Sequence, residues 1–360
     1  MSRPSARALT ALLTVAALAA VGCGSDDDGA AARPATTVRA GAAAPTTVDI
    51  GGRQPFATTS AWNRTIGSLP PAPHSARMIK IASESPLATR DRTSHDRERN
   101  NRNLYVNTTG WAPGVYRVGT GSTVKMVCRQ GACGRKGDPP PATLTLPADA
   151  VPDPGHDGWL VLVDEQAGIV WDLWRARRGG DTIAYAFARK WRLTGDGAGP
   201  LAQNGTPRAP SLRGSGLPML GGLIRPVELR SGTIPHALAI AIPNPRAGRF
   251  VRPASTTNGL GSNRSVPEGA RLRLRASAVA RLQRRDELSP GATAIVQALM
   301  TYGAIVVDRA DSPTLYAQRN GDYRTVLRGN DLAAIKLSDF DVLSTGSLQL
   351  DPDAPPEATR

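Results

Sequence analysis

The sequence predicts a mainly β protein: an antiparallel, jelly-roll-like β-sandwich with one or a few short helices. Six short segments are either apolar or alternate apolar with polar residues, as strands do. "ARLRLRA" at 270–276 alternates most plainly. The glycine-containing linker "EQAG" between two of these segments is typical of an antiparallel hairpin. The 37 glycines and 30 prolines indicate many loops.

The first 22 residues predict a lipoprotein signal peptide. Arg3 and Arg7 precede the apolar run "ALTALLTVAALAAV", which has the length of a signal-peptide core and is short for a bilayer span. Small residues then lead to Cys23, whose sulfur would receive a diacylglycerol before cleavage. Ala20 stands where leucine is usual in this motif. The alternative is an ordinary secretory signal, with Cys23 a spare thiol.

The rest of the chain divides by composition. Residues 23–50 consist mainly of small and polar residues and predict a disordered tether, whereas residues 347–360 predict a flexible tail. Residues 51–346 are enough for a single β-sandwich domain. No later segment is apolar for long enough to span a bilayer. We therefore expect an extracytoplasmic domain anchored to the bacterial membrane by the lipid on Cys23.

The two remaining cysteines, Cys128 and Cys133, predict a disulfide. They form one pair once Cys23 is lipidated, and such a pair oxidises outside the cytoplasm. A glycine-containing hairpin tip between them brings two Cα atoms within reach. Two cysteines without a second pair make a poor zinc site, so we expect no metal and no cofactor.

Six strands and one helix are expected between the tether and the tail. The helix begins after Ser289 as N-cap, with Pro290 at its first position, and Gly303 ends it in a left-handed conformation. Its buried face would include Ile295, Ala298, Leu299 and Tyr302. The strands are expected at residues 158–164, 168–177, 182–191, 236–243, 270–276 and 304–309.

Several motifs occur in an order that resembles a family of secreted bacterial β-rich proteins without an established activity. They are "SAWNRTIGSLPPAPHS", "HDGWLVLVDEQAGIVWDLWRA", "SGLPMLGGLIRPVELRSGTIPHALAIAIP", "PEGARLRLRA" and "ALMTYGAIVVDR". The resemblance covers about residues 60–343 and implies an extracellular domain with a glycan partner, but no catalytic residues. A glycine- and serine-rich stretch of that pattern is replaced here by the charged "RDRTSHDRERNNRN".

Some polar residues are of the types that catalysis on a polysaccharide requires. For β-elimination, Arg225 would neutralise a uronate carboxylate, His236 or His156 would act as base, and Tyr302 would donate a proton. For glycoside hydrolysis, two carboxylates among Asp157, Asp172 and Glu228 would have to lie about 5–9.5 Å apart. The alternative for His236, which the sequence favours, is that its ring hydrogen-bonds a carbonyl and fixes the turn before its strand. Asp164 and Asp308 complete the polar candidates.

Trp171 and Trp174 are three residues apart on one predicted strand, so they point to opposite faces of the sheet. At most one of them can join the core on the side of Trp159. The other either fills a second sheet layer, which the pattern favours, or stacks on a sugar.

The charge indicates an anionic partner. The chain carries 39 arginines and five lysines, and its net charge is +14. Acidic polysaccharides or cell-wall polymers suit such a surface; a biased codon composition is the alternative. Nucleic acid does not suit it, because the chain is exported and its basic residues are not interleaved with aromatics. We expect polysaccharide binding, with or without cleavage; the alternative is a non-catalytic envelope binding or scaffold lipoprotein.

Overall fold

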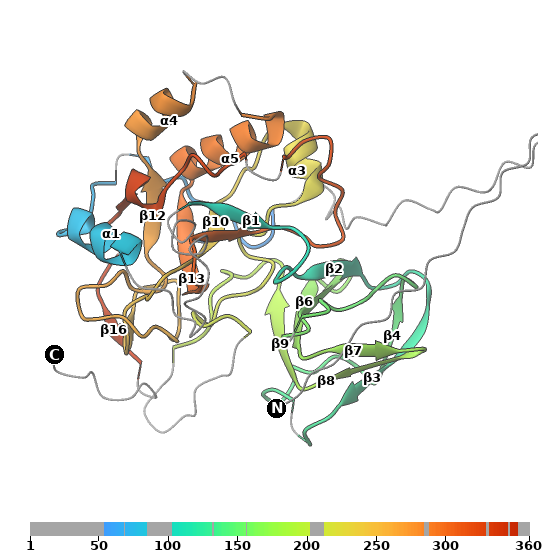
Figure 1. Ribbon diagram of the computed structural model, residues 1–360. Coiled ribbons are helices and arrows are strands. Elements are labelled where there is room, and N and C mark those ends of the chain that lie inside the picture. The colour runs from blue at the N-terminus through green and yellow to red at the C-terminus, as the bar shows by residue number, and fades with distance from the viewer. Residues whose placement is uncertain are drawn as a thin grey trace, which may run out of the picture. The chain divides into compact units, whose positions relative to one another are not determined.

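The computed structural model describes residues 54–84 except 68, and residues 103–351 except 132, 156, 202–211, 284–287, 329–330 and 345. The described part of the chain is mainly β, as predicted, with sixteen strands in four sheets (Figure 1). The signal peptide, Cys23 and the tether lie outside the described residues. Those described belong to one compact unit.

The largest sheet has six strands and is buried on both faces. In spatial order its strands are β1 (Tyr105–Asn107), β14 (Thr314–Tyr316), β10 (Leu238–Ile242), β13 (Ala304–Arg309), β12 (Arg271–Leu274) and β15 (Phe340–Val342). Apolar side chains alternate along β10. Leu238 and Ile240 join the cluster beneath the helices, whereas Ala239 and Ala241 join the cluster on the opposite face.

Two four-stranded sheets face each other across a third apolar cluster, which contains Leu162 and Trp171 from one sheet and Val124 and Ile183 from the other. One sheet has the order β2 (Gly114–Arg117), β5 (Leu160–Asp164), β6 (Ile169–Trp174), β9 (Phe187–Arg192). The other has the order β4 (Thr143–Leu146), β3 (Ser122–Cys128), β8 (Thr182–Tyr185), β7 (Arg177–Gly179).

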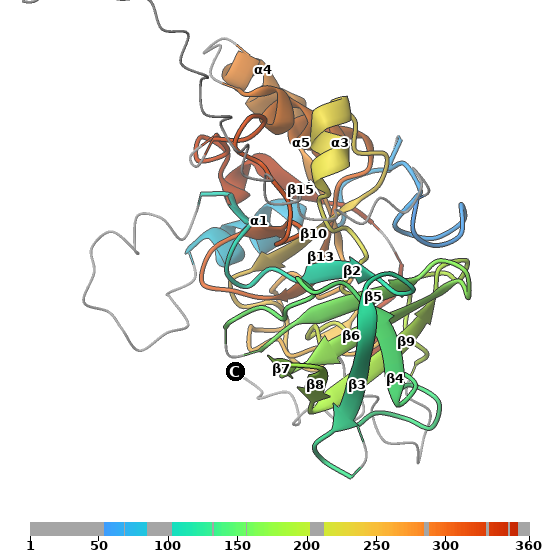
Figure 2. The ribbon, with the colours of Figure 1, turned by 90° about the vertical axis from the view of Figure 1, so that its right-hand side faces the viewer.

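The four helices of the described part pack on one face of the six-stranded sheet (Figures 1 and 2). They are α1 (Ser75–Glu84), α3 (Pro226–Ser231), α4 (Ala276–Gln283) and α5 (Pro290–Thr301), and the 3₁₀ helix η1 (Leu337–Asp339) lies nearby in the same cluster. The predicted helix is α5. Ser289 caps it by accepting a hydrogen bond from the Ala292 N–H, and Gly303 follows it at φ 70°.

All six predicted strands form, but one segment makes two. Residues 182–191 contain β8 and β9, which belong to different sheets, and the chain turns between them at Ala186, whose N–H donates to Trp174 O. The predicted hairpin is confirmed, because β5 and β6 pair antiparallel. The predicted disulfide is also confirmed: Cys128 and Cys133 are bonded, with their Cα atoms 5.7 Å apart.

The sheets are mixed, although an antiparallel arrangement was expected. Strand β10 runs parallel to β13, and β2 runs parallel to β5. Parallel neighbours need a long crossover, and the connection from β10 to β13 supplies one that includes β12 and α5. Helix-covered parallel pairs are buried on both faces, so their strands are apolar throughout and alternation does not reveal their direction.

The tail begins later than residue 347. Strand β16 (Gln349–Leu350) pairs antiparallel with β11 (Arg249–Phe250), and the buried Asp351 carboxylate accepts hydrogen bonds from Thr256 Oγ1 and the Thr257 N–H. These backbone and side-chain bonds hold a segment whose composition alone indicates flexibility. Among the described residues, no helix combines the length and apolar character needed to cross a bilayer.

Candidate functional site

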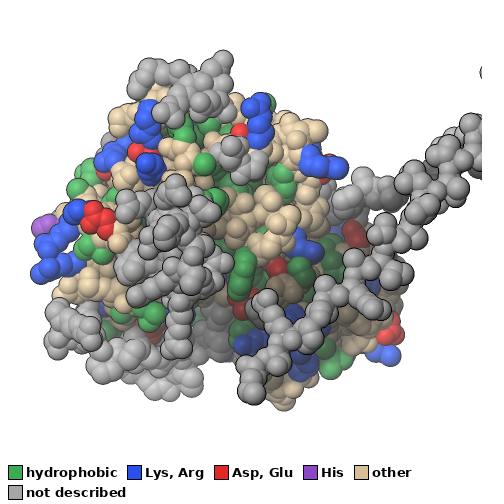
Figure 3. All heavy atoms as spheres, in the orientation of Figure 1, with side chains coloured by type: hydrophobic (Ala, Val, Ile, Leu, Met, Phe, Trp, Pro, Cys, Tyr) green, Lys and Arg blue, Asp and Glu red, His purple; other side chains and the backbone are tan. Residues whose placement is uncertain are grey.

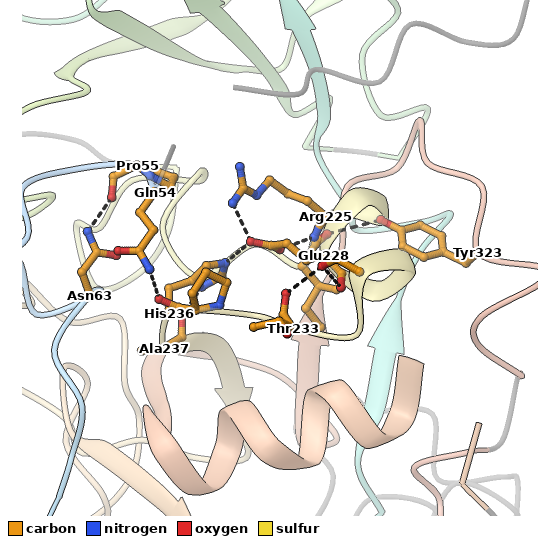
Figure 4. Close-up of polar contacts among 12 residues, drawn as sticks. Gln54, Pro55, Asn63, Arg225, Glu228, Thr233, His236, Ala237 and Tyr323 are labelled. Carbon is orange, nitrogen blue, oxygen red and sulfur yellow. Dashed lines mark hydrogen bonds and ion pairs between the residues drawn. The ribbon is translucent and has the colours of Figure 1, made fainter. Parts of the chain in front are cut away.

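The structure brings together three of the predicted catalytic residues. Glu228 lies in α3, Arg225 immediately precedes that helix, and His236 precedes β10. Glu228 Oε1 lies 2.9 Å from His236 Nε2 and 2.5 Å from Arg225 Nη2, so one carboxylate oxygen joins both side chains (Figure 4). Glu228 Oε2 accepts the Arg225 N–H at 2.9 Å. The sequence placed Arg225 and Glu228 in a loop; Pro226 instead starts a short helix there.

This cluster is closed to substrate. His236 is 3% exposed, and its second ring nitrogen, Nδ1, lies 2.9 Å from Ala237 O. Burial by itself raises the pKa of Glu228, but the adjacent His236 and Arg225 more than offset that effect and hold the pKa at about 2. The carboxylate is therefore ionised at neutral pH and fully engaged with its neighbours. The side chains of Arg225, Glu228 and His236 therefore connect α3 to the start of β10, and we call this cluster the brace.

The other predicted catalytic residues do not join the brace. Asp157 Oδ1 accepts a hydrogen bond from Trp174 Nε1 at 3.1 Å beside β6. Tyr302 caps the end of α5 and packs against the apolar cluster on the opposite face of the six-stranded sheet. His156 lies outside the described residues. The arrangement needed for β-elimination, with Arg225, His236 and Tyr302 around one substrate, is therefore not formed.

The aspartates serve separate structural roles. Asp172 is buried between sheets, where its Oδ2 accepts from Trp191 Nε1 at 2.7 Å and from the Met219 N–H at 2.9 Å. Burial raises its pKa to about 6, although these two hydrogen bonds oppose the change. Asp308 accepts from the Gly214 N–H, and Asp164 accepts from the Ala167 N–H in the β5–β6 turn. Asp172 and Asp308 thus fasten the segment that contains Gly214 and Met219.

The tryptophan pair points to opposite faces of β6, as predicted. Trp171 is buried in the cluster between the two four-stranded sheets, and Trp174 packs against the cluster on the other side, which also contains Trp159. Both therefore fill sheet layers. Neither stands free as a platform for a sugar, and the guanidinium of Arg175 covers the Trp174 ring at 4.2 Å.

Two adjoining pockets lie elsewhere, and arginines line both. The first, which we call the α1 pocket, has a volume of about 410 Å³; its basic side chains are His74, Arg77, Arg246 and Arg264. On the face shown in Figure 3, basic side chains and a histidine gather at the left edge, where Figure 1 places α1. None of the described residues that line this pocket is acidic.

The second pocket, which we call the Arg271 pocket, has a volume of about 770 Å³ and contains Arg64, Arg252 and Arg271. Among the described residues of its lining, Asp196 is the one that is acidic. The two pockets share Ser344 and Gly346, so they are contiguous. The described linings of the two pockets together contain six arginines and a histidine against one carboxylate, which makes a surface suited to an anion.

Sequence reasoning did not identify these pocket residues. Arg64 belongs to the motif "SAWNRTIGSLPPAPHS" and Arg271 to the predicted strand "ARLRLRA", and neither pattern indicates a binding role. No local spacing connects positions 64, 77, 246, 252, 264 and 271. The arginine excess was the available signal, and it indicates the sign of a partner's charge without locating the site.

A comparison of the chain with protein-family models, curated proteins and solved structures gives no match. The resemblance to secreted β-rich proteins therefore stays a prediction. Within the described part of the chain, no group of three or more His, Cys, Asp and Glu side chains is arranged to hold a metal ion.

Replacement of His236 by alanine should destabilise the protein by about 3 kcal/mol, because it leaves the Glu228 carboxylate buried without one of its two partners. Urea unfolding measures this change. The exposed His74, replaced by asparagine, is the matched control, since asparagine tolerates its φ of 64°. A His236→Ala variant as stable as the control would contradict the structural role.

Asp172 should make the protein less stable as the pH rises from about 4 to 6. Its folded pKa of about 6 exceeds its ordinary value of 3.8, so the folded state holds the proton more tightly. The stabilisation is complete below pH 4 and is lost above pH 6, on the order of 3 kcal/mol. Urea unfolding of Asp172→Asn should lack this dependence, whereas the exposed control Asp149→Asn should retain it. If the free energy of unfolding changed with pH in the same way in the wild type and in Asp172→Asn, the predicted effect of Asp172 would be disproved.

Proposed function

We propose that the protein is a lipid-anchored extracytoplasmic binding protein that holds an acidic polysaccharide or cell-wall polymer in its arginine-lined pockets. The observation that carries the proposal is the predominance of basic side chains around two contiguous pockets. A polymer with regularly spaced anionic groups can contact several of these side chains at once. Each contact raises the effective concentration of the next anionic group, so the overall affinity exceeds that of a single contact.

Binding without cleavage fits the geometry better than catalysis. The brace of Arg225, Glu228 and His236 is buried, and none of these three residues lines either pocket. The carboxylates Asp157 and Asp172 each hold an indole N–H instead of facing a pocket. We accordingly propose that the protein binds the predicted polysaccharide partner without cleaving it.

The membrane anchor extends this proposal. Cys23 and the residues that follow it would keep the pockets near the membrane surface, where the envelope polymers attached to or crossing that surface are concentrated. A lipidated N-terminal cysteine carries more than one acyl chain, which is sufficient for stable anchoring.

The full-length protein in mild detergent should bind immobilised polygalacturonate or polyglycerol phosphate, but not dextran, and the affinity should fall with added salt. The double variant Arg77→Gln/Arg264→Gln should weaken binding about tenfold at low salt, because it removes two exposed charged contacts. Biolayer interferometry measures both effects.

The double variant Arg117→Gln/Arg324→Gln provides the matched control. It changes the net charge by the same amount but lies outside both pockets. An equal loss in both double variants would mean that net charge alone attracts the polymer. Release of reducing ends or unsaturated uronates, abolished in a folded His236→Ala variant, would instead establish an enzyme.

Replacement of Cys23 by serine should move the protein from the membrane fraction to the soluble fraction of a bacterial host. Metabolic labelling with an alkyne fatty acid should mark the wild type and not this variant, because the thiol is the attachment point for the diacylglycerol. The Cys128→Ser/Cys133→Ser variant should remain labelled. Membrane association of unlabelled Cys23→Ser protein would refute the lipid anchor.

A further inference from the structure

One arginine in the Arg271 pocket is buried and has no acidic partner among the described residues. Arg271 begins β12 and is 6% exposed, yet its side chain contributes to the pocket lining. Its two terminal nitrogens donate to backbone carbonyls, Nη1 to Tyr302 O and Nη2 to Ala61 O. These neutral acceptors fix the guanidinium in position, and no described carboxylate compensates its charge.

A second uncompensated arginine lies beside it. Arg64 is exposed, lines the same pocket, and forms no ion pair with any described residue. Burial, and to a smaller extent the nearby positive charge of Arg64, lower the pKa of Arg271 to about 10. Arg271 therefore remains charged at neutral pH. Two like charges in one pocket repel each other, and an anion between them would relieve that repulsion.

The third arginine of this pocket differs in this respect. Arg252 Nη2 lies 3.8 Å from Asp196 Oδ2, and Arg252 Nη1 donates to Gly199 O at 2.7 Å. The single carboxylate of the pocket is thus associated with Arg252. The uncompensated positive charge is concentrated on Arg64 and Arg271.

The backbone is arranged so that Arg271 can reach this position. Its side-chain stem passes over Gly303, where an added Cβ would lie 3.2 Å from Arg271 Cδ and 2.4 Å from Leu272 O. Gly303 also has φ 70°, which favours glycine. The residue that ends α5 therefore leaves the space in which the guanidinium is held between Ala61 and Tyr302.

We propose that Arg271 and Arg64 form an oxyanion subsite that receives one carboxylate or phosphate group of the bound polymer. Guanidinium groups offer paired N–H donors that match both kinds of oxyanion. Arg271 supplies a fixed charge at the pocket wall, and Arg64 closes on the anion from the exposed side. The identification of the polymer rests on the proposed function, whereas anion binding at this subsite is measurable without a polymer.

Inorganic phosphate is the simplest probe. Thermal unfolding of the full-length protein in 50 mM phosphate, compared with chloride at equal ionic strength, should show a midpoint raised by about 2–4 °C if the subsite binds in the millimolar range. Arg64→Gln should lose most of this increment. Arg271→Met should also lose it, and it retains the apolar stem of the side chain.

Two control variants distinguish phosphate binding at the subsite from a general effect of salt on stability. Arg77→Gln lies in the α1 pocket and Arg324→Gln lies outside both pockets, so both should keep the full increment. An increase in the unfolding midpoint that persists unchanged in Arg64→Gln overturns the subsite. This variant should fold even where Arg271→Met does not, because Arg64 is exposed and makes no hydrogen bond to a described residue.

The polymers distinguish the source of the oxyanion and separate the two proposals. Preferential loss of polygalacturonate binding in Arg64→Gln identifies a carboxylate, and preferential loss of polyglycerol phosphate binding identifies a phosphate. A phosphate increment that depends on Arg64, together with no binding of either polymer, supports the subsite and contradicts the proposed function. Polymer binding that is unchanged in both Arg64→Gln and Arg271→Met supports the proposed function and overturns the subsite.

Discussion

The arrangement of this protein depends on a strand that is buried on both faces. Leucine and isoleucine side chains of β10 pack beneath the helices, whereas its alanines face the opposite apolar cluster. Backbone also approaches this strand closely, because the Ala239 N–H donates to Gly222 O and the Ala237 N–H donates to Trp62 O. A Cβ at Gly222 would lie 2.3 Å from Ala239 N, so no larger residue fits this close approach. Burial on both faces and this close backbone approach determine where the flanking loops lie.

Those loops determine the two kinds of polar environment in the molecule. On the helix side, α3 precedes β10 and carries Glu228, so the turn between them is fastened by the Arg225–Glu228–His236 brace. Every charge in that brace has an opposite or hydrogen-bonding partner, as stability in a buried site requires. In the Arg271 pocket, backbone carbonyls hold the Arg271 guanidinium at the pocket wall, and no described carboxylate pairs with it. This difference separates residues that hold the fold from residues that are available to a ligand.

Much of the local structure was predictable. Alternating or continuous apolar runs identified six strands, and Ser289, Pro290 and Gly303 defined the limits of α5, because these signals act within one turn or one strand. The cysteine pair was predictable from compartment and count. Strand direction was not predictable, because a strand buried on both faces is apolar throughout and shows no alternation that would distinguish antiparallel from parallel pairing. The start of the tail was also misjudged, since β16 is held by its pairing with β11 and not by its own composition.

The sequence by itself determined the mainly β class, the hairpin, the disulfide and the excess of positive charge, because each follows from composition or from residues close together in the chain. Only the tertiary structure decided what the polar residues do. It buried His236 against Glu228. The sequence had favoured a structural role for His236 but had left a catalytic one open. The tertiary structure also assembled Arg64 and Arg271 from segments about 200 residues apart beside one pocket. Whether a charge is neutralised or left facing a cavity depends on its neighbours in space, and those neighbours are fixed by the packing of sheets and loops.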